Sequence, residues 1–382
     1  MNFFEAQDKA RRNTVWLIIL FVLAVAGLIV LTNLLLLGVM VYIKTGQFLF
    51  SLESLQNYYS WREFIGVTIV VCLLILGGSF YKTMSLSGGG ASVAEMLGGR
   101  LISQATSDLQ QRQLLNVVEE MAIASGMPVP KVYLLEDTSI NAFAAGRTPA
   151  NAVIGVTRGT LGRLSREELQ GVIAHEYSHI ANGDMRLNIR LIGLLHGIML
   201  IGLIGYFILR SLRFGGRSRS SNSKGGSGIL AVAAIGGGLM VIGYAGSFFG
   251  QWIKAIVSRQ REYLADSSAV QFTRNRDGIA GALKKIGGSA GVSSHLDSPA
   301  APEYSHAYFA DGVSSFWHSL FATHPPLEKR IKAIEPRWDG QFLASSFSQT
   351  VSPEAVEPES PRNENLAMTA AILSSAEQAI SQ

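Results

Sequence analysis

Residues 15–43 read VWLIILFVLAVAGLIVLTNLLLLGVMVYI, a run without a charged side chain. As an α-helix this run would be about 43 Å long, whereas the hydrocarbon core of a bilayer is about 30 Å thick. Lys9, Arg11 and Arg12 precede it, as in a signal peptide. However, the run is about twice as long as the apolar region of a signal peptide and lacks a small-residue cleavage pattern. The sequence therefore predicts a retained membrane anchor that tilts or extends beyond the bilayer.

The composition of the whole chain agrees with membrane contact. Of the 382 residues, 48% are hydrophobic and only 16% are charged, whereas a soluble protein carries about 25% charged residues. The same apolar excess excludes intrinsic disorder of the whole chain. Cys72 is the only cysteine, which excludes a disulfide scaffold and a cysteine-ligated zinc finger.

Three further apolar runs follow the first. The third run of the chain contains His196 as its only ionisable group, for which we expect packing at a helix interface rather than metal ligation. Gly246 and Gly250, in the fourth run, form a small-residue pair suited to close helix packing. The chain is therefore predicted to have about four transmembrane helices, the later three at Phe64–Tyr81, Leu191–Leu209 and Ile229–Ile253.

The basic residues mostly flank these runs, so we expect no nucleic-acid partner despite the net charge of +4. By the positive-inside rule, the basic residues before the first run place the N-terminus in the cytoplasm, and Lys82 and Arg100 agree after two crossings. The segment from about 86 to 190 is then cytoplasmic. The linker at 210–228 is also rich in basic residues. Its charge leaves open whether the third and fourth runs cross the membrane fully.

The soluble segments predict an α+β fold. Ser107–Ser125 has the pattern of an amphipathic helix, and Ser165 with Glu168 forms a capping box that opens a helix running to about Asn182, where Gly183 ends it. Between these helices lie three short segments with strand propensity, separated by turn residues, at Lys131–Leu135, Ile140–Ala144 and Ala152–Val156.

The capped helix contains the motif AHEYSH at 174–179. Residues four apart share one face of a helix, so His175 and His179 can bind a single ion. Glu176 projects about 100° around the helix from that face, where it can serve as a general base instead of a ligand. The pattern predicts a zinc site rather than a chance match.

Two histidines leave a zinc site one protein ligand short. A metzincin would carry a third histidine where this chain has Met185, which excludes that group. After the fourth apolar run, Glu262 and Asp266 are again four residues apart on one helical face. Glu262 can supply the third ligand, and Asp266 can accept a hydrogen bond from the other ring nitrogen of a ligating histidine. The alternative for this pair is a solvated, charged face of a surface helix.

At this point the chain resembles the HtpX-type membrane-bound zinc metalloproteases, which are related to the CAAX prenyl peptidases. The resemblance covers most of positions 1–340 and includes the two N-terminal spans, AHExxH, EYxAD and the late motif His324-Pro325-Pro326. It implies one Zn²⁺ per chain, with Glu176 as base, Asp266 supporting a ligand, and the ligands His175, His179 and Glu262. It also implies a zincin-like catalytic domain that faces the cytoplasm from the cell inner (plasma) membrane, in a multi-pass protein that cleaves misfolded or damaged membrane proteins.

The resemblance extends to weaker candidates. It implies that an edge strand takes up an extended substrate, or else is an ordinary core strand, at Asn141, Ala142, Phe143 and Ala144. His324 could reach the developing oxyanion of the scissile carbonyl, or could have a structural or helix-capping role. Arg330 could pair with a carboxylate near the metal, although such an arginine is usually on the surface. For Asp184 we expect a turn contact at the end of the helix rather than a role at the metal.

The expected organisation follows the spans and motifs. It consists of an N-terminal anchor at 1–85, a first catalytic part at 86–190, an apolar hairpin at 191–253 with the basic linker 210–228, a second catalytic part at 254–340 and a mobile tail at 341–382. The expected fold class is α+β, as a mainly α-helical integral membrane protein with a small catalytic sheet. The expected partners are protein or peptide substrates and the lipid bilayer, and the oligomeric state is left open.

Other functions are less well supported. A CAAX-type prenyl-protein peptidase encloses its site in a larger ring of helices, for which four spans are too few. A catalytically silent membrane scaffold would be favoured if the motif lacked its glutamate, but Glu176 is present. A transporter would need buried charges or broken polar helices within its spans, which this chain lacks beyond His196. The sequence therefore favours a Glu-assisted zinc endopeptidase.

Overall fold

A computed structural model describes residues 3–46, 59–86, 88–215, 226–289 and 322–344, all of which belong to one compact unit, Met1–Ser346. Several expectations lie outside the described residues. These are the middle of the basic linker at 210–228 and nearly all of the tail at 341–382.

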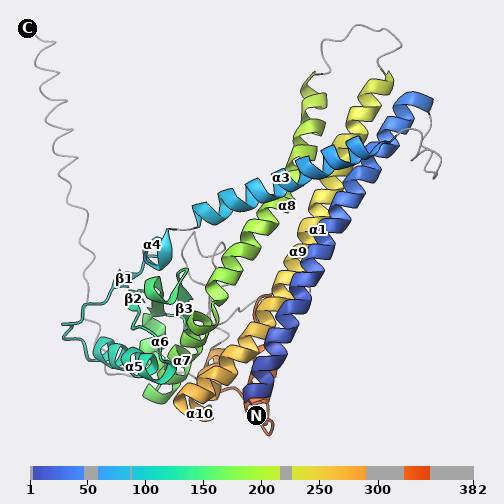
Figure 1. The fold of residues 1–382 in the computed structure, drawn as a ribbon. Helices are drawn as coiled ribbons and strands as arrows, with labels where there is room; N and C mark the ends of the chain where they lie inside the picture. Colours follow the sequence, from blue (N-terminus) through green and yellow to red (C-terminus); the bar gives the residue numbers. More distant parts are fainter. Residues whose placement is uncertain (1–2, 47–58, 87, 216–225, 290–321, 345–382) are drawn as a thin grey trace, which may run out of the picture. The chain divides into compact units, whose positions relative to one another are not determined.

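Four long helices form the apolar part of the structure (Figure 1), and each is long and apolar enough to cross a membrane. They confirm the four predicted apolar helices but extend beyond the predicted runs. The fourth, for example, continues past Ile253 to Thr273 and carries the EYxAD motif on the same continuous helix. The four helices are α1 (Phe3–Thr45), α3 (Trp61–Ser85), α8 (Asp184–Gly215) and α9 (Gly226–Thr273).

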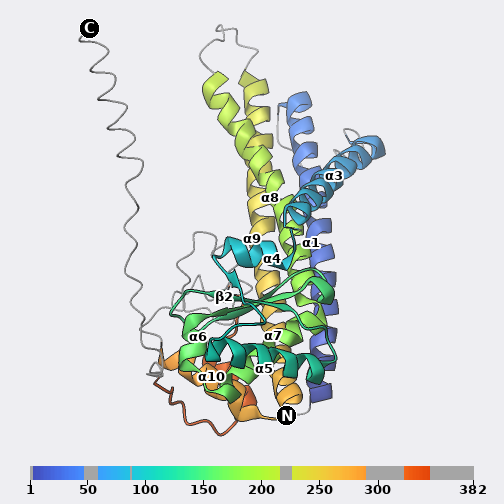
Figure 2. The same ribbon diagram turned by 90° about the vertical axis from the view of Figure 1, so that its left-hand side faces the viewer.

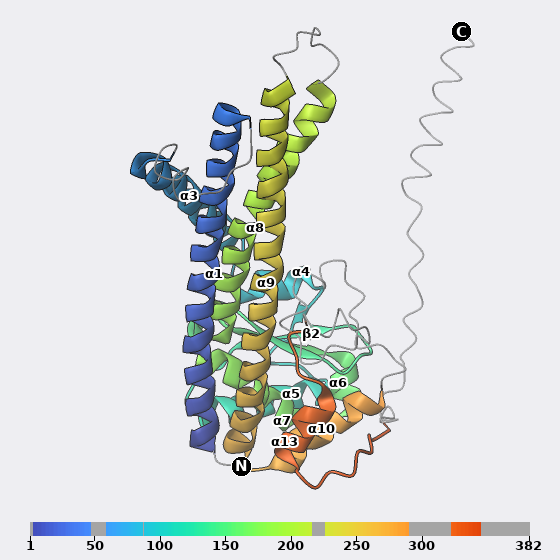
Figure 3. The same cartoon turned by 90° about the vertical axis from the view of Figure 1, so that its right-hand side faces the viewer.

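Small residues allow these helices to approach closely. A Cβ atom on Gly243 of α9 would lie 2.1 Å from the backbone nitrogen of Gly202 on α8, so only glycine fits there. The predicted pair also lies at helix interfaces, where a Cβ on Gly246 would approach Leu28 and one on Gly250 would approach Leu195. The views in Figures 1 and 3 show α1, α8 and α9 running side by side.

The sheet is small and mixed, with the order β1-β2-β4-β3. The two central strands are parallel, and both outer pairings are antiparallel. Phe143 of β3 pairs with Gly155 of β4, and a Cβ on Gly155 would lie 2.2 Å from the Phe143 ring, so the glycine makes room for the aromatic side chain. Because β3 is the last strand in this order, it is an edge strand of the sheet. The strands are β1 (Arg100–Leu101), β2 (Lys131–Leu135), β3 (Ala142–Ala145) and β4 (Val153–Thr157).

Helices cover both faces of the sheet (Figure 2). α4 (Gly89–Met96) covers a small apolar cluster that includes Phe143 and Tyr133. The opposite face packs on α5 (Leu109–Ser125) and α7 (Arg166–Asn182), which share the main core of the catalytic part. The remaining helices are α6 (Arg158–Arg163), α10 (Arg276–Gly288), α13 (Leu327–Ile334) and a short 3-10 turn at Pro149–Asn151.

The caps of α7 confirm the sequence prediction. The Ser165 side chain accepts from the backbone N–H of Glu168, and the Glu168 carboxylate accepts from the backbone N–H of Ser165 over 2.7 Å. At the other end Gly183 adopts a left-handed conformation with φ 68°, which an L side chain rarely takes. The helix that carries the AHEYSH motif therefore begins and ends at residues that the sequence itself specifies.

Candidate metal centre

The histidines of α7 point to one centre, as their spacing predicts. Nε2 of His175 lies 3.1 Å from Nε2 of His179. His175 is fully buried, and the side chain of His179 is 16% exposed. One turn of helix therefore presents two nitrogen donors side by side, and of the two only His179 is partly exposed.

Glu262 of α9 completes the cluster. Its Oε2 atom lies 3.6 Å from Nε2 of His175, and its Oε1 atom lies 3.5 Å from Nε2 of His179. Ligands about 2.0–2.1 Å from a tetrahedral zinc ion are about 3.4 Å from one another. The three donors, which all lie within 4.8 Å of one another, therefore fit a single ion of this kind. Glu262 is buried rather than part of a solvated helical face.

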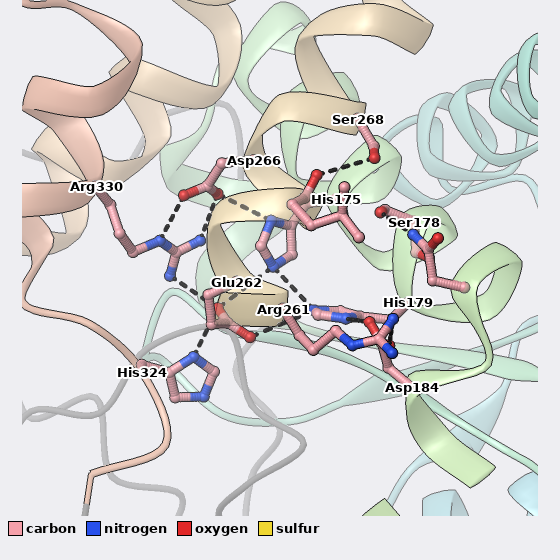
Figure 4. Close-up of polar contacts among 12 residues, drawn as sticks. His175, Ser178, His179, Asp184, Arg261, Glu262, Asp266, Ser268, His324 and Arg330 are labelled. Carbon is pink, nitrogen blue, oxygen red and sulfur yellow. Dashed lines mark hydrogen bonds and ion pairs between the residues drawn. The ribbon is translucent and has the colours of Figure 1, made fainter. Parts of the chain in front are cut away.

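Two aspartates hold the far sides of the imidazole rings (Figure 4). Oδ1 of Asp266 lies 3.0 Å from Nδ1 of His175, as expected from the sequence, and Oδ2 of Asp184 lies 2.9 Å from Nδ1 of His179. A carboxylate on Nδ1 fixes the ring so that Nε2 faces the centre and makes it a better donor. The expected contact of Asp184 at the end of the helix is found: α8 begins at this residue, and its side chain turns back onto His179 in the last turn of α7.

Two arginines neutralise these aspartates. Arg330 of α13 is fully buried, donates to Asp266 from Nε over 2.9 Å and from Nη2 over 2.7 Å, and lies 3.3 Å from Glu262. Arg330 is thus at the site and not on the surface. Burial lowers the pKa of its guanidinium, but the nearby Asp266 outweighs this effect and raises the pKa above its ordinary value. At the second aspartate, Nη1 of Arg261 on α9 lies 3.0 Å from Oδ1 of Asp184.

Burial and close partners shift the pKa values of the α7 side chains. Burial alone would lower the pKa of His179, but its hydrogen bond to Asp184 and the nearby Glu262 raise the pKa to about 9. Burial raises the pKa of the Glu176 carboxyl. The Oε2 atom of Glu176 has no hydrogen-bond partner among the described residues, so a buried acceptor with raised basicity lies beside the three donors.

His324 is brought to the same place from the motif that precedes α13. Its Nδ1 atom lies 2.8 Å from Oε2 of Glu262, and its Nε2 atom has no hydrogen-bond partner in the described part of the chain. The ring is buried and lines the cleft described below. Figure 4 shows Glu262 between His324 and the histidine pair of α7.

A cleft opens onto these residues, with an empty volume of about 930 Å³ when the open solvent at its mouth is included. One part of its lining is polar and contains Glu176, His179, Glu262 and His324. The other part is apolar and comes from the ends of the membrane helices and from α4, with Leu86, Val93, Met185, Leu187, Ile189 and Ile192. The edge strand contributes Ala144 and Ala145.

The edge strand is held by the residue that precedes it, Asn141. The backbone N–H of Asn141 donates to the hydroxyls of Thr157 and Thr160, and the backbone N–H of Thr157 donates to the Asn141 carbonyl. Because hydrogen-bonded pairs alternate along an antiparallel ladder, Ala142 and Ala144 then direct their backbone groups away from β4. The Asn141 side chain accepts from the Ala142 N–H over 3.0 Å.

Sequence reasoning missed the second ion pair of the site, Asp184 with Arg261. Its one sequence signal is that Arg261 immediately precedes Glu262, but nothing local indicates that Asp184 is the partner. His196 is not at the site. Its ring centroid lies 6.2 Å from that of Tyr81 on α3, which fits the expected position between helices.

Comparisons with known proteins agree with this geometry. The family model for peptidase family M48 matches residues 108–337. A protease HtpX homolog from Ligilactobacillus salivarius is 36% identical over 269 residues, which cover 70% of this chain and 83% of the relative. A protease HtpX homolog from Listeria monocytogenes serotype 4a is 36% identical over 301 residues, which cover 77% and 95%. Among solved structures, the crystal structure of S. mikatae Ste24p matches with a TM-score of 0.40 and 18% identity, covering 86% of this chain and 66% of that chain.

The match to the M48 family covers more than half of the chain and spans every candidate metal-site residue. The relatives confirm the resemblance that the motifs predicted. Four apolar helices place the chain in a membrane, and the family implies a metal. The chain therefore belongs to peptidase family M48 and is an HtpX-like membrane metalloprotease.

Proposed function

We propose that the chain is a zinc endopeptidase in which His175, His179 and Glu262 hold one Zn²⁺ and Glu176 is the general base. The observation that carries this proposal is the set of three donor atoms, separated by 3.1 to 3.6 Å, beside the buried Oε2 atom of Glu176. Zinc, when bound, supplies a Lewis acid that lowers the pKa of a water molecule to about 7 and polarises a peptide carbonyl.

The protein's own residues would move the proton. Glu176 takes it from the attacking water, because its carboxylate is a stronger base than usual and has an oxygen without another partner. The same carboxyl then passes the proton to the leaving amine. Asp184 and Asp266 keep the two imidazoles oriented, and no covalent bond to the enzyme forms.

We assign His324 to the developing oxyanion of the scissile carbonyl. The support is its place in the cleft lining and the Nε2 atom that lacks a described partner. An N–H at Nε2 could donate to negative charge that appears in the transition state. Its other nitrogen lies 2.8 Å from Glu262, which would hold the ring in place.

We propose that the edge strand at Asn141, Ala142, Phe143 and Ala144 binds the substrate by strand addition. Ala144 lines the cleft, and the ladder alternation turns its N–H and C=O groups outward. At Ala142 the carbonyl remains available, whereas the N–H already donates to the Asn141 side chain. Phe143 packs beneath α4 on the other face and supports the strand rather than touching substrate.

We further propose that the substrates are misfolded or damaged membrane proteins and that the site faces the cytoplasm from the cell inner membrane. The support for the orientation is the row of basic residues at the catalytic ends of the apolar runs, with Lys82, Arg190 and Lys254. The support for membrane-protein substrates is the anchorage of the site beside four apolar helices. The organisation into an anchor at 1–85, two catalytic parts at 86–190 and 254–340, and a hairpin at 191–253 is part of the same proposal.

The test combines metal analysis with proteolysis. Purified protein should contain zinc near one ion per chain and should cleave both casein and a reconstituted membrane protein. Glu176→Gln should keep the zinc and lose cleavage of both, whereas Glu262→Ala should lose the zinc. Unchanged zinc content in Glu262→Ala would remove Glu262 from the site, and undiminished cleavage by Glu176→Gln would remove the proposed base.

A further inference from the structure

The apolar helices share a boundary on the side of the catalytic residues. Three of the four apolar runs meet a basic residue there, with Lys82 on α3, Arg190 on α8 and Lys254 on α9. Aromatic side chains of the kind that sit at membrane–water interfaces lie close to this boundary on three helices and are exposed, at Trp16, Tyr81 and Trp252.

Contacts between helices put these residues at one level. Leu191 and Ile253, the neighbours of Arg190 and Lys254, belong to one buried cluster that also contains Phe21 of α1. A Cβ on Gly193 of α8 would lie 2.4 Å from the Thr83 hydroxyl on α3. The basic residues of α3, α8 and α9 therefore mark one surface across the bundle, which is where the positive-inside rule predicts the end of the bilayer.

Two helices give the distance from this surface to the metal centre. On α9 the chain runs from Lys254 to Glu262 in about two turns, or about 12 Å of helix. On α8 it runs from Arg190 back to Asp184, which binds His179, in about 9 Å. Both helices therefore place the metal centre about 10 Å from this surface.

The cleft bridges this distance. At one end it is lined by Glu176 and His179, and at the other by Ile192, which lies beyond Arg190 on the membrane side. Leu86, which directly follows the end of α3, lines the cleft as well. An apolar wall that begins at the bilayer surface and ends at the metal suits a polypeptide that has just left the lipid.

We infer that the cleft receives an extended polypeptide directly from the bilayer surface and that its length sets a minimum spacing for cleavage. This inference rests on the proposed function and specifies its substrates further. Because an extended chain advances about 3.3 Å per residue, the first bond that can reach the metal lies about three to four residues beyond the end of a membrane span.

The experiment uses the whole enzyme in proteoliposomes with single-span reporter substrates. Each reporter carries the same casein-derived tail, joined to the span directly or through two, four or eight additional residues. The cleavage products are mapped by mass spectrometry. We expect the cut nearest the span to stay about three to four residues from it in every reporter, so that it falls in the tail of the directly joined reporter and within the added residues when eight are inserted.

The nearest cut would overturn the inference if it fell inside the span or within two residues of it, or if it stayed at one bond of the tail. Casein added to the same proteoliposomes separates the two proposals. If casein is cleaved in a zinc-dependent way but the reporters show no minimum spacing, only the inference fails. If neither substrate is cleaved, the proposed function fails and the inference fails with it.

A variant tests the membrane end of the cleft. Ile192→Trp fills this end, so the ratio of kcat/KM for the reporter to kcat/KM for casein should fall about fivefold or more. Leu73→Trp is the matched control, because Leu73 is 64% exposed on the apolar part of α3 and does not line the cleft. It should leave the ratio unchanged. An unchanged ratio in Ile192→Trp would count against entry from the bilayer surface.

Discussion

Arg330 and Asp266 form a buried bidentate ion pair between α13 and α9, with donor–acceptor distances of 2.9 and 2.7 Å. Asp266 also lies 3.0 Å from Nδ1 of His175, so the pair continues directly to a candidate metal ligand. The geometry ties the helix after the His324-Pro325-Pro326 motif to the back of the metal centre. Replacing either residue with a neutral one would leave the other as a buried charge without its partner.

Arg330→Ala should destabilise the protein by about 3–5 kcal/mol, because it leaves the carboxylate of Asp266 buried without its cation. Arg330→Lys keeps the charge but loses the two parallel hydrogen bonds, so its stability should lie between that of Arg330→Ala and that of wild type. Thermal unfolding in detergent measures the effect. Arg276→Ala, on the exposed side of α10, is the control and should change little. Equal unfolding midpoints for Arg330→Ala and wild type would contradict the prediction.

Asp184→Asn should weaken zinc binding by about 10–100-fold, because the carboxylate that orients and polarises His179 is lost. Arg261→Gln should act in the same direction with a smaller effect, since Arg261 acts on His179 only through Asp184. Competition with a chromophoric chelator measures the affinity. Asp277→Asn makes the same chemical change on the surface, where the side chain is 79% exposed, and should bind zinc as tightly as wild type. Wild-type affinity in Asp184→Asn would show that the contact has no role in metal binding.

The metal-free protein should lose stability as the pH rises toward 9. The hydrogen bond to Asp184 and the nearby Glu262 outweigh burial and raise the pKa of His179 to about 9, against about 6.5 in the unfolded chain. A raised pKa in the folded state adds stability that is complete below about 6.5 and disappears as the pH passes through the folded-state value. We expect a loss of roughly 1–3 kcal/mol over this window.

Unfolding of chelator-treated protein between pH 6 and 10 tests this expectation. The Asp184→Asn variant should show a smaller dependence, because its histidine loses the partner that raises the pKa. Zinc affinity should rise over the same window, since a ligating histidine must be neutral. A stability that is constant with pH in the metal-free wild type would contradict the assignment.

Backbone methylation of a peptide substrate should reduce cleavage at alternate positions. A substrate strand that pairs with β3 uses the N–H groups of every second residue, so only those positions should be sensitive. Each sensitive position should lower kcat/KM by about tenfold, which corresponds to about one hydrogen bond. The insensitive positions serve as internal controls. A uniform loss at all positions, or none, would contradict strand addition to this edge.

The sequence predicts the elements whose signals are local. The four apolar helices, the capped α7 helix and the strand at Lys131–Leu135 are all found. The start of β3 differs because Asn141 bonds the Thr157 and Thr160 hydroxyls instead of continuing the strand. Those partners come from a later strand and helix, which no local pattern around Asn141 could indicate.

By itself, the sequence determined the parts of the site that one helix can specify. His175 with His179, and Glu262 with Asp266, share a face because residues four apart on a helix must do so. Only the tertiary structure decided that Arg330 meets Asp266, that Asp184 turns back onto His179 and that Arg261 joins it. The contact of Asp184 with His179 depends on the turn that joins α7 to α8. The other two depend on how separate helices pack, and spacing along the chain carries no information about the distance between elements that lie far apart in it.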